Sequence, residues 1–313
     1  MGCPGLEGGD VLRPRDRELA RRLEAALMLF DCEKGALPGI ADAAARETFI
    51  EQILESIRRA SYPSTIAARP ISERRTDPND QLFDPIRAAI LLKRSGAVEE
   101  AFWMVFLFVH FGKHPKSGWH YARQVCGRLG GRGKWDWASV SSDPAAFRIW
   151  FDANLGSFGD HEPHGFGNHR KYESLSETGA VVESYVRWVA PPRSHQELMN
   201  EALHSSGGDG RIAFDRIYRS KTVASFGRTA RFDYLTMVSK LALSPIEPGS
   251  TYMSGATGPL KGARLLLGSN DRPVNLDKAL VELDSELKVG MQVLEDALCN
   301  WQKSPSVFKP FRS

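Results

Sequence analysis

Apolar residues recur every three or four positions along most of the chain, the spacing of helices that bury one face. Convincing period-two alternation, which would indicate strands, is absent. Helices are therefore predicted over the ranges 15–30, 43–59, 86–93, 99–111, 175–189, 194–204, 213–218 and 225–243, and one long helix over 278–301. The pattern predicts an all-α protein.

Breaks between these segments indicate how the helices are grouped. The Ser61–Pro85 segment is rich in proline and polar residues and is interpreted as a long ordered loop rather than a domain boundary. Ser205–Gly210 is a glycine-containing turn that could serve as a hinge. We expect a single helical unit over residues 1–313, which could divide into lobes of about 15–205 and 211–303 with a cleft between them.

The composition indicates the cellular compartment of the protein but does not identify its binding partner. The 313 residues contain 41 Lys and Arg against 38 Asp and Glu, and a net charge of +3 is too small to identify a binding partner. The four cysteines form no CxxC pair, which favours a reducing compartment and argues against structural zinc or an iron–sulfur cluster. The longest apolar run, 101–111, is too short to cross a bilayer. We expect a cytoplasmic monomer without a cofactor.

The stretch from Ser254 to Asp277 carries the most specific candidate chemistry. Gly255, Gly258 and Pro259 predict a tight turn that leads into an apolar helix containing Lys261. A helix N-terminus after such a turn presents free backbone N–H groups that suit a phosphate. An ordinary helical turn with a C-terminal glycine stop would leave the same pattern.

A second candidate surface lies within Gly112–Asp160, where basic residues alternate with tryptophan and tyrosine. Cationic groups attract phosphates and aromatic rings stack on bases, so this composition is typical of a nucleic-acid groove. Arg132, Lys134 and Trp135 are the candidate contacts in its glycine-rich part. A solvated basic face beside a core tryptophan is the alternative.

Two further clusters are candidate ligand contacts. His169, Arg170, Lys171 and Glu173 resemble polar groups around an anionic ligand. The neighbouring 161–164 segment has two histidines and a glutamate, but without a helical HxxxH or HExxH framework it does not predict a metal site.

The predicted helix over 225–243 places Arg228, Arg231, Asp233 and Lys240 among apolar residues. An aspartate near two arginines is either a structural ion pair or part of a cluster that holds a base or a phosphate. Its position just upstream of the glycine turn favours the second interpretation. Gln52, outside the apolar face of the 43–59 helix, is also a candidate DNA contact.

The glycine turn resembles the hairpin of helix-hairpin-helix DNA glycosylases, which has the form LPGVGxKTA and is followed after a helix by an aspartate. Lys261 and Ala263 match the Lys-x-Ala of the hairpin, Gly258 and Gly262 flank that lysine, and Asp277 matches the acid. One residue is inserted between Gly258 and Lys261, and the segment before Asp277 is slightly short. The resemblance implies two helical lobes with the hairpin at 254–267.

Longer strings resemble the alpha-glutamyl/putrescinyl thymine pyrophosphorylase family over most of the chain. They are RETFIEQILESIRR, DPNDQLFDPIRAAILLKRSG, EEAFWMVFLFVHFGKH, FGNHRKYESL, SFGRTARFDYL and GSTYMSGATGPLKGARLLL. The resemblance implies an enzyme that acts on modified bases of phage DNA. One branch elaborates hydroxymethylated thymine, and another resembles an anti-phage glycosylase that excises glucosylated hydroxymethylcytosine.

The resemblance to the glycosylase branch implies roles for the candidates. Asp277 would stabilise an oxocarbenium-like sugar or activate water, and Lys261 would either attack the sugar or contact phosphate. The loop around Arg132–Trp137 would fill the space left by a flipped base. Candidates for a roomy sugar-binding pocket are His169, Arg170, Glu173, Arg228, Arg231 and Asp233.

The expected partner is double-stranded DNA that contains glucosylated bases. Two other functions remain open: a transferase that displaces pyrophosphate from an activated thymine, and a non-catalytic DNA-binding module.

Overall fold

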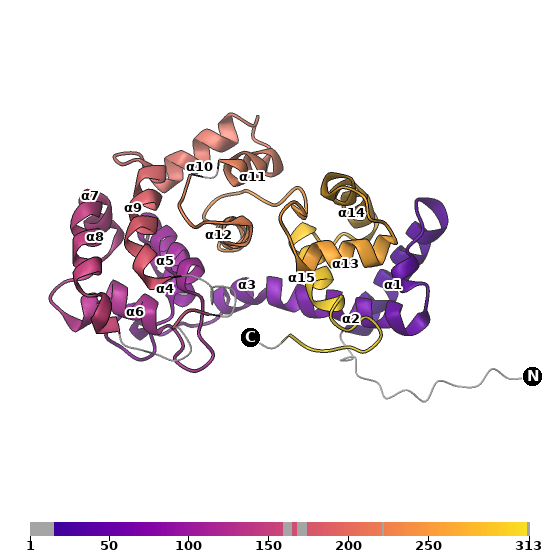
Figure 1. The fold of residues 1–313 in the computed structure, drawn as a ribbon, viewed down its shortest axis with the longest axis horizontal. Helices are drawn as coiled ribbons and strands as arrows, with labels where there is room; N and C mark the ends of the chain where they lie inside the picture. The colour runs from indigo at the N-terminus through magenta and orange to yellow at the C-terminus, as the bar shows by residue number, and fades with distance from the viewer. Residues whose placement is uncertain (1–15, 159–164, 168–173, 221, 312–313) are drawn as a thin grey trace, which may run out of the picture. The chain divides into compact units, whose positions relative to one another are not determined.

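The chain folds into α-helices joined by loops and short 3-10 turns (Figure 1). The computed structural model describes residues 16–158, 165–167, 174–220 and 222–311. Within these ranges the sole β-type pairing is an isolated bridge between His114 and Gly118. The all-α prediction is confirmed.

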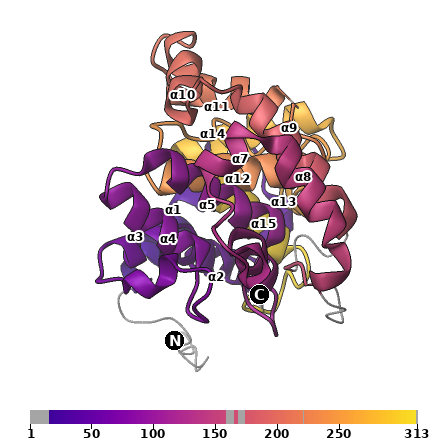
Figure 2. The same ribbon diagram turned by 90° about the vertical axis from the view of Figure 1, so that its left-hand side faces the viewer.

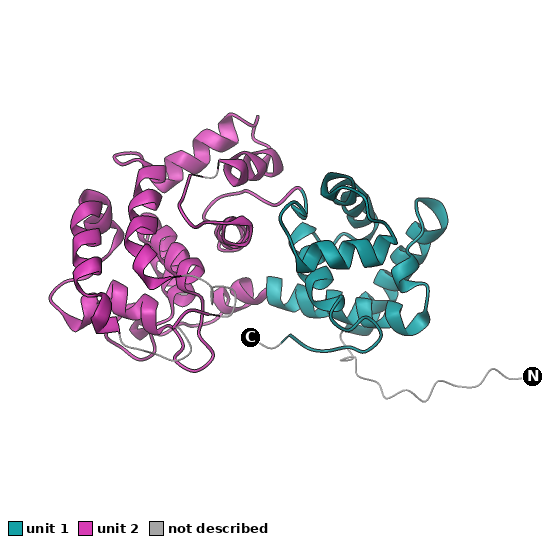
Figure 3. Ribbon diagram, viewed as in Figure 1, with its two compact units in different colours: residues 1–60, 250–312 teal, residues 61–249, 313 magenta. Residues whose placement is uncertain are grey.

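The helices form two compact units, shown in Figure 3. Unit 1 joins the first 60 residues of the chain to residues 250–312, and unit 2 contains residues 61–249. The division therefore falls at Ala60 and Ser250, and the Ser205–Gly210 turn lies inside unit 2. Each unit brings together helices that carry different candidate residues.

Unit 1 is built from both ends of the chain around one hydrophobic core. Its elements are α1 (Arg17–Glu33), η2 (Pro38–Ile40), α2 (Ala43–Ala60), α13 (Gly258–Leu267), α14 (Pro273–Leu287) and α15 (Met291–Trp301). The core includes fully buried Leu23, Phe49, Leu280, Leu294 and Trp301. These residues come from four helices at helical spacing, which explains why the apolar pattern predicted the helices well.

Glycine allows the backbones of α13 and α15 to approach closely. A Cβ atom on Gly262 would lie 2.3 Å from the carbonyl oxygen of Leu298, and one on Gly258 would lie 2.8 Å from Cys299 Sγ. On its other side, α13 meets Gly39, where a Cβ would lie 2.2 Å from the carbonyl oxygen of Leu265. Packing alone therefore accounts for the absence of side chains at these positions.

The prediction of one helix over 278–301 is wrong, because α14 and α15 are separate helices. The chain turns at Lys288 and Gly290, whose φ angles are 52° and 91°. Asp284 stabilises this turn by accepting hydrogen bonds from the N–H groups of Val289 and Gly290, each at 2.9 Å. Since α14 starts at Pro273, Asp277 lies inside this helix rather than before it.

Unit 2 surrounds a central helix that is buried on nearly every side. Its α-helices are α3 (Tyr62–Ala67), α4 (Pro85–Arg94), α5 (Val98–Phe111), α6 (His120–Cys126), α7 (Trp137–Ser142), α8 (Pro144–Ala153), α9 (Thr178–Val189), α10 (His195–His204), α11 (Gly210–Arg219) and α12 (Arg228–Lys240). Its 3-10 turns are η3 (Glu73–Thr76), η4 (Arg128–Gly130), η5 (Leu155–Phe158) and η7 (Leu175–Glu177). Helix α5 lies against α4, as Figure 1 and Figure 2 show, and also contacts α12.

Two features of unit 2 differ from the sequence prediction. The Ser61–Pro85 segment, predicted as a loop, contains α3 and η3, and the basic segment that follows α5 contains α6, α7 and α8. These are short helices, and a helix of two turns carries too few apolar positions to show a clear period. Helix α4 begins one residue before the predicted range of 86–93, and Asp84 caps it by accepting a hydrogen bond from the N–H of Arg87 at 3.0 Å.

Replacement of Gly262 with alanine is expected to destabilise unit 1. The added methyl group would collide with the α15 backbone and force the two helices apart, so we expect a loss of roughly 2 kcal/mol or more. Urea unfolding followed by circular dichroism measures this. Gly156→Ala is the control, since its Cβ would meet no atom within 4 Å. Equal effects of the two substitutions would contradict the packing explanation.

Candidate functional site

Asp277 holds the chain segment that leads into the glycine turn. Its Oδ1 atom accepts a hydrogen bond from the Thr251 hydroxyl at 2.6 Å. The backbone N–H of Met253 donates to both carboxylate oxygens, at 3.2 Å and 3.1 Å. Thr251 and Met253 are fully buried, whereas Asp277 is partly exposed. The acid is thus held by two buried residues and is itself partly exposed.

The turn and the helix after it have the predicted form. Gly255 has a φ of 78°, α13 begins at Gly258, and Pro259 occupies its first turn. Thr257 makes no side-chain cap, so the N-terminus of α13 is not closed by its own capping residue. Lys261 is exposed one turn into the helix. The turn, Lys261 and Asp277 all belong to unit 1, and the role of these residues as a site stays a prediction.

In unit 2, the two candidate arginines on α12 each lie against an aromatic ring. The Arg231 guanidinium donates to the carbonyl oxygen of Tyr218 and lies 4.7 Å from the centre of the Tyr218 ring. Arg228 lies over the Phe232 ring at 5.2 Å. Asp233 is two residues beyond Arg231, and residues at this spacing do not face each other on a helix. These contacts hold the two arginines against aromatic rings.

The cavity beside α12 is small. Arg231 and Tyr234 line it together with Trp188 and Phe226, and its volume is about 20 Å³. Such a space accommodates a single water molecule. A pyrimidine with an attached sugar therefore requires a different site or an opening of this one.

The predicted basic loop is exposed, but its tryptophan is not. Arg132 and Lys134 are exposed, and Lys134 Nζ lies 3.9 Å from Asp77 Oδ1. Trp135 is 5% exposed, and the Arg128 guanidinium covers its ring at 4.4 Å. The loop can thus offer cations to a phosphate backbone, while Trp135 contributes to the core. His169, Arg170, Lys171 and Glu173 lie outside the described residues.

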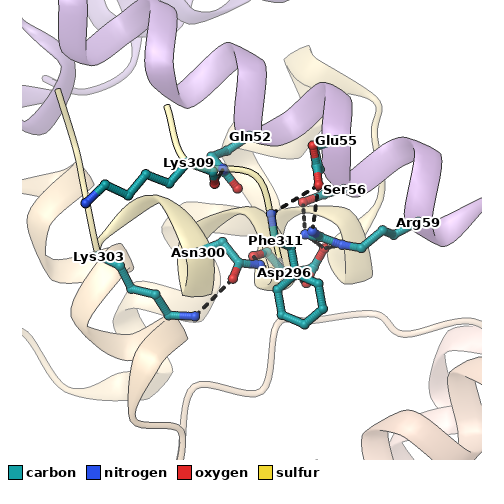
Figure 4. Close-up of polar contacts among 9 residues, drawn as sticks. All are labelled: Gln52, Glu55, Ser56, Arg59, Asp296, Asn300, Lys303, Lys309 and Phe311. Atoms are coloured by element: carbon teal, nitrogen blue, oxygen red, sulfur yellow. Dashed lines mark hydrogen bonds and ion pairs between the residues drawn. The ribbon is translucent and has the colours of Figure 1, made fainter. Parts of the chain in front are cut away.

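Gln52 is buried beneath the C-terminal segment of the chain (Figure 4). Its side chain is 1% exposed, and its Nε2 atom donates to the carbonyl oxygen of Lys309 at 2.8 Å. The N–H of Phe311 donates to Glu55 at 3.2 Å, and the Phe311 ring covers the Arg59 guanidinium at 4.6 Å. Gln52 is therefore covered in this structure.

A buried chain of hydrogen bonds in unit 2 was not predicted from the sequence. Glu99 accepts from His195 Nδ1 at 2.7 Å, His195 Nε2 lies 2.6 Å from the Tyr185 hydroxyl, and that hydroxyl lies 2.9 Å from the Tyr234 hydroxyl. Burial opposes ionisation of Glu99, but hydrogen bonds from His195 outweigh it and lower the pKa of Glu99. Burial also lowers the pKa of His195, which stays neutral at pH 7.

These contacts fix which group donates and which accepts in each hydrogen bond from Glu99 to Tyr234. Since His195 Nδ1 carries the proton toward Glu99, its Nε2 accepts from Tyr185, and the Tyr185 oxygen accepts from Tyr234. Burial raises the pKa of both tyrosines, so both remain protonated. Tyr234 also lines the small cavity, which links the chain to Arg231. The residues come from four separate helices, and none of them was singled out from the sequence.

The chain is similar to a known protein family. A family model described as alpha-glutamyl/putrescinyl thymine pyrophosphorylase clade 3 matches residues 44–313. The chain belongs to this family. Searches of curated proteins and of solved structures each returned no match. The match covers α2 to the C-terminal segment and therefore includes every described candidate residue.

Family membership indicates an enzyme related to the modification of DNA bases, with DNA as its substrate. In the part of the chain that the structure describes, no helix has the length and apolar character needed to span a membrane. Within the same ranges, no three His, Cys, Asp or Glu side chains are grouped as metal ligands. The candidate residues that the structure describes in this pyrophosphorylase-family chain are mainly acids, cations and aromatic residues.

The pKa of Glu100 is shifted in the opposite direction from that of its neighbour Glu99. Burial raises the pKa of its carboxyl group to about 7, although the N–H of Trp137 donates to it at 2.6 Å. Glu99 and Glu100 are consecutive residues of α5, yet one is ionised and the other titrates near neutral pH.

The raised pKa of Glu100 predicts a pH dependence of stability. The folded protein binds this proton more tightly than the unfolded chain, whose glutamate has a pKa near 4.5. The resulting stabilisation is complete below pH 4.5 and is lost as the pH rises through 7. Compared with Glu100→Gln, the native chain should lose up to about 3 kcal/mol between pH 4.5 and pH 8.

Chemical unfolding of both chains at a series of pH values measures this difference. Glu99→Gln is the matched control, because the pKa of Glu99 is lowered and its effect has the opposite sign. A constant difference between the native chain and Glu100→Gln at all pH values would disprove the assignment.

Proposed function

We propose that this protein is a DNA glycosylase that excises a hypermodified base, most specifically glucosylated hydroxymethylcytosine, from phage DNA and leaves an abasic site. The observation that supports the proposal is the placement of Asp277 at the base of the glycine turn, held by Thr251 and Met253. A turn that binds a DNA phosphate would bring the adjacent deoxyribose toward this acid.

Asp277 would act by stabilising charge. Cleavage of the glycosidic bond develops positive charge on the sugar, and a fixed carboxylate lowers the energy of that transition state. Three hydrogen-bond contacts orient Asp277 before the substrate arrives, so little reorganisation is needed during the reaction. Asp277 is partly exposed, as a residue that meets the substrate must be.

Lys261 has two possible roles in this proposal. Its exposed amine could attack the anomeric carbon, form a Schiff base and lead to strand cleavage, or it could contact phosphate while water acts as the nucleophile. Borohydride reduction during turnover distinguishes them, since only the first role gives a covalent protein–DNA adduct.

Unit 2 carries further candidate contacts to DNA. Arg132 and Lys134 are exposed and suit the phosphate backbone, and the base must leave the stack to react. Asp233, Arg228 and Arg231 remain candidates for contacts to the base. Anti-phage defence in the cytoplasm is the biological role that this activity would serve.

A transferase is the second candidate, and the description of the family favours it. Its name specifies a pyrophosphorylase of thymine derivatives. In that reaction an amine displaces pyrophosphate from an activated hydroxymethyl pyrimidine, and the glycosidic bond stays intact. The two activities therefore release different products.

Incubation of the protein with unmodified, hydroxymethylated and glucosylated DNA, without any amine donor, tests the proposal. We expect free modified base and abasic sites, detected by mass spectrometry. Asp277→Asn should reduce the rate by about 10²–10³-fold, the range expected for loss of one preorganised electrostatic group. Asparagine keeps an oxygen that can accept from Thr251 and Met253, so the fold should be retained.

Asp271→Asn is the matched control, because Asp271 is an exposed acid between α13 and α14. It should leave the rate unchanged. Pyrophosphate release from an activated substrate without abasic sites would favour the transferase, and full activity of Asp277→Asn would remove Asp277 from the mechanism.

A further inference from the structure

The C-terminal segment occupies a surface formed by α2 and α15 in unit 1 (Figure 4). Its contacts with α2 include the Lys309 carbonyl on Gln52, the Phe311 N–H on Glu55, and the Phe311 ring on Arg59. Lys309 and Pro310 are otherwise exposed. The segment therefore presents one carbonyl oxygen, one N–H and one flat ring to α2.

Arg59 is held in place without help from this segment. Its guanidinium donates to Asp296 through Nε at 3.0 Å and also through Nη2, and it reaches Ser56 at 3.2 Å and Glu55 at 3.4 Å. Asn300 in turn donates to the Asp296 carboxylate at 3.2 Å. These bonds occupy the edge of the guanidinium and leave its flat face for stacking. Such a face binds any planar aromatic ring.

Gln52 is only half satisfied beneath the segment. Its Nε2 atom has the Lys309 carbonyl as partner, but Oε1 is buried without a hydrogen-bond donor. A buried acceptor without a partner is unfavourable, and few occur in native structures. The residue after Lys309 is Pro310, which has no N–H to offer. The C-terminal segment is thus an incomplete ligand for Gln52.

A nucleobase would complete these contacts. The edge of a base presents acceptors and donors side by side, which a glutamine amide can bind with both of its atoms. Its ring would take the place of the Phe311 ring on the Arg59 face, since arginine stacks on bases in single-stranded nucleic acids.

We propose that Gln52 and Arg59 form a nucleobase-binding site, and that Phe311 and the Lys309 carbonyl mimic the base and compete for that site within the molecule. This proposal deepens the proposed function, on which it rests, because it assigns a base contact in unit 1 and a segment that regulates access to it. The site takes a base from single-stranded or locally opened DNA, because a paired base cannot present its ring face to Arg59.

Binding of a fluorescein-labelled single-stranded oligonucleotide of unmodified DNA, measured by anisotropy, tests the proposal. Phe311→Ala removes the competing ring without a change of charge, and it should bind the oligonucleotide about three- to tenfold more tightly than the native chain. The double variant Phe311→Ala, Arg59→Lys keeps the charge but loses the flat face, and it should lose this gain. Val307→Ala, an exposed position of the same segment, is the control and should bind like the native chain.

A chain that ends at residue 307 provides a second variant. It loses two cations, Lys309 and Arg312, so an increase in its affinity cannot come from general attraction to DNA. A peptide of sequence FKPFRS should displace the oligonucleotide from the shortened chain. Thermal unfolding of each variant shows whether it is folded.

Equal affinity of Phe311→Ala and the native chain would overturn the proposal, as would a gain that persists in the double variant. A peptide that binds the shortened chain without displacing the oligonucleotide would show a site for the segment alone. Base release is measured separately: tighter binding without base release would preserve this site and refute the glycosylase, and base release without tighter binding would do the reverse.

Discussion

Acidic side chains that accept hydrogen bonds from backbone N–H groups of other segments fix several of the joins between helices in this protein. Each helix begins with N–H groups that have no partner within the helix, and a protein of many short helices has many of them. Glu99 of α5 accepts from the N–H of His195 at 2.8 Å and from that of Gln196 at 3.3 Å. Glu100 accepts from Trp137. Two consecutive acids of α5 thus fix the starts of α10 and α7.

The acids that accept hydrogen bonds from backbone N–H groups do not share one electrostatic environment. Glu99 receives two N–H groups and an imidazole and is ionised, whereas Glu100 receives one N–H in a more buried setting and titrates near neutral pH. In unit 1, Asp277 of α14 fixes the segment before α13 by accepting from Met253. Acids that would appear catalytic from their burial and contacts therefore also carry structural tasks.

The sequence predicted the long amphipathic helices because their apolar faces recur over several turns. It did not predict the break between α14 and α15, since Asp284 stabilises that break and Leu280, Leu283 and Leu287 continue the apolar period up to it. Short helices such as α7 were not predicted because they contain too few turns to show an apolar period. The division into units was also hidden, because unit 1 joins segments that are about two hundred residues apart.

Candidate residues were predictable where a local motif carried them, as in the turn before α13. The hydrogen bond between Glu99 and His195 and the cover over Gln52 join residues that are 96 and 257 positions apart, respectively, and no local pattern records such contacts. Gln52 was singled out by its polarity on a helix with an apolar face. What the sequence could not supply was its partner, the Lys309 carbonyl.

The contacts of Asp277 bear on which chemical role it could take. A general base must accept a proton from water, so it needs an oxygen that is free to do so. Thr251 and Met253 together donate to both oxygens of Asp277, so each oxygen already has a donor within the protein. A carboxylate bound in this way suits electrostatic stabilisation of a cationic sugar better than activation of water. If Asp277 is catalytic, the water or amine that completes the reaction must be activated by another group.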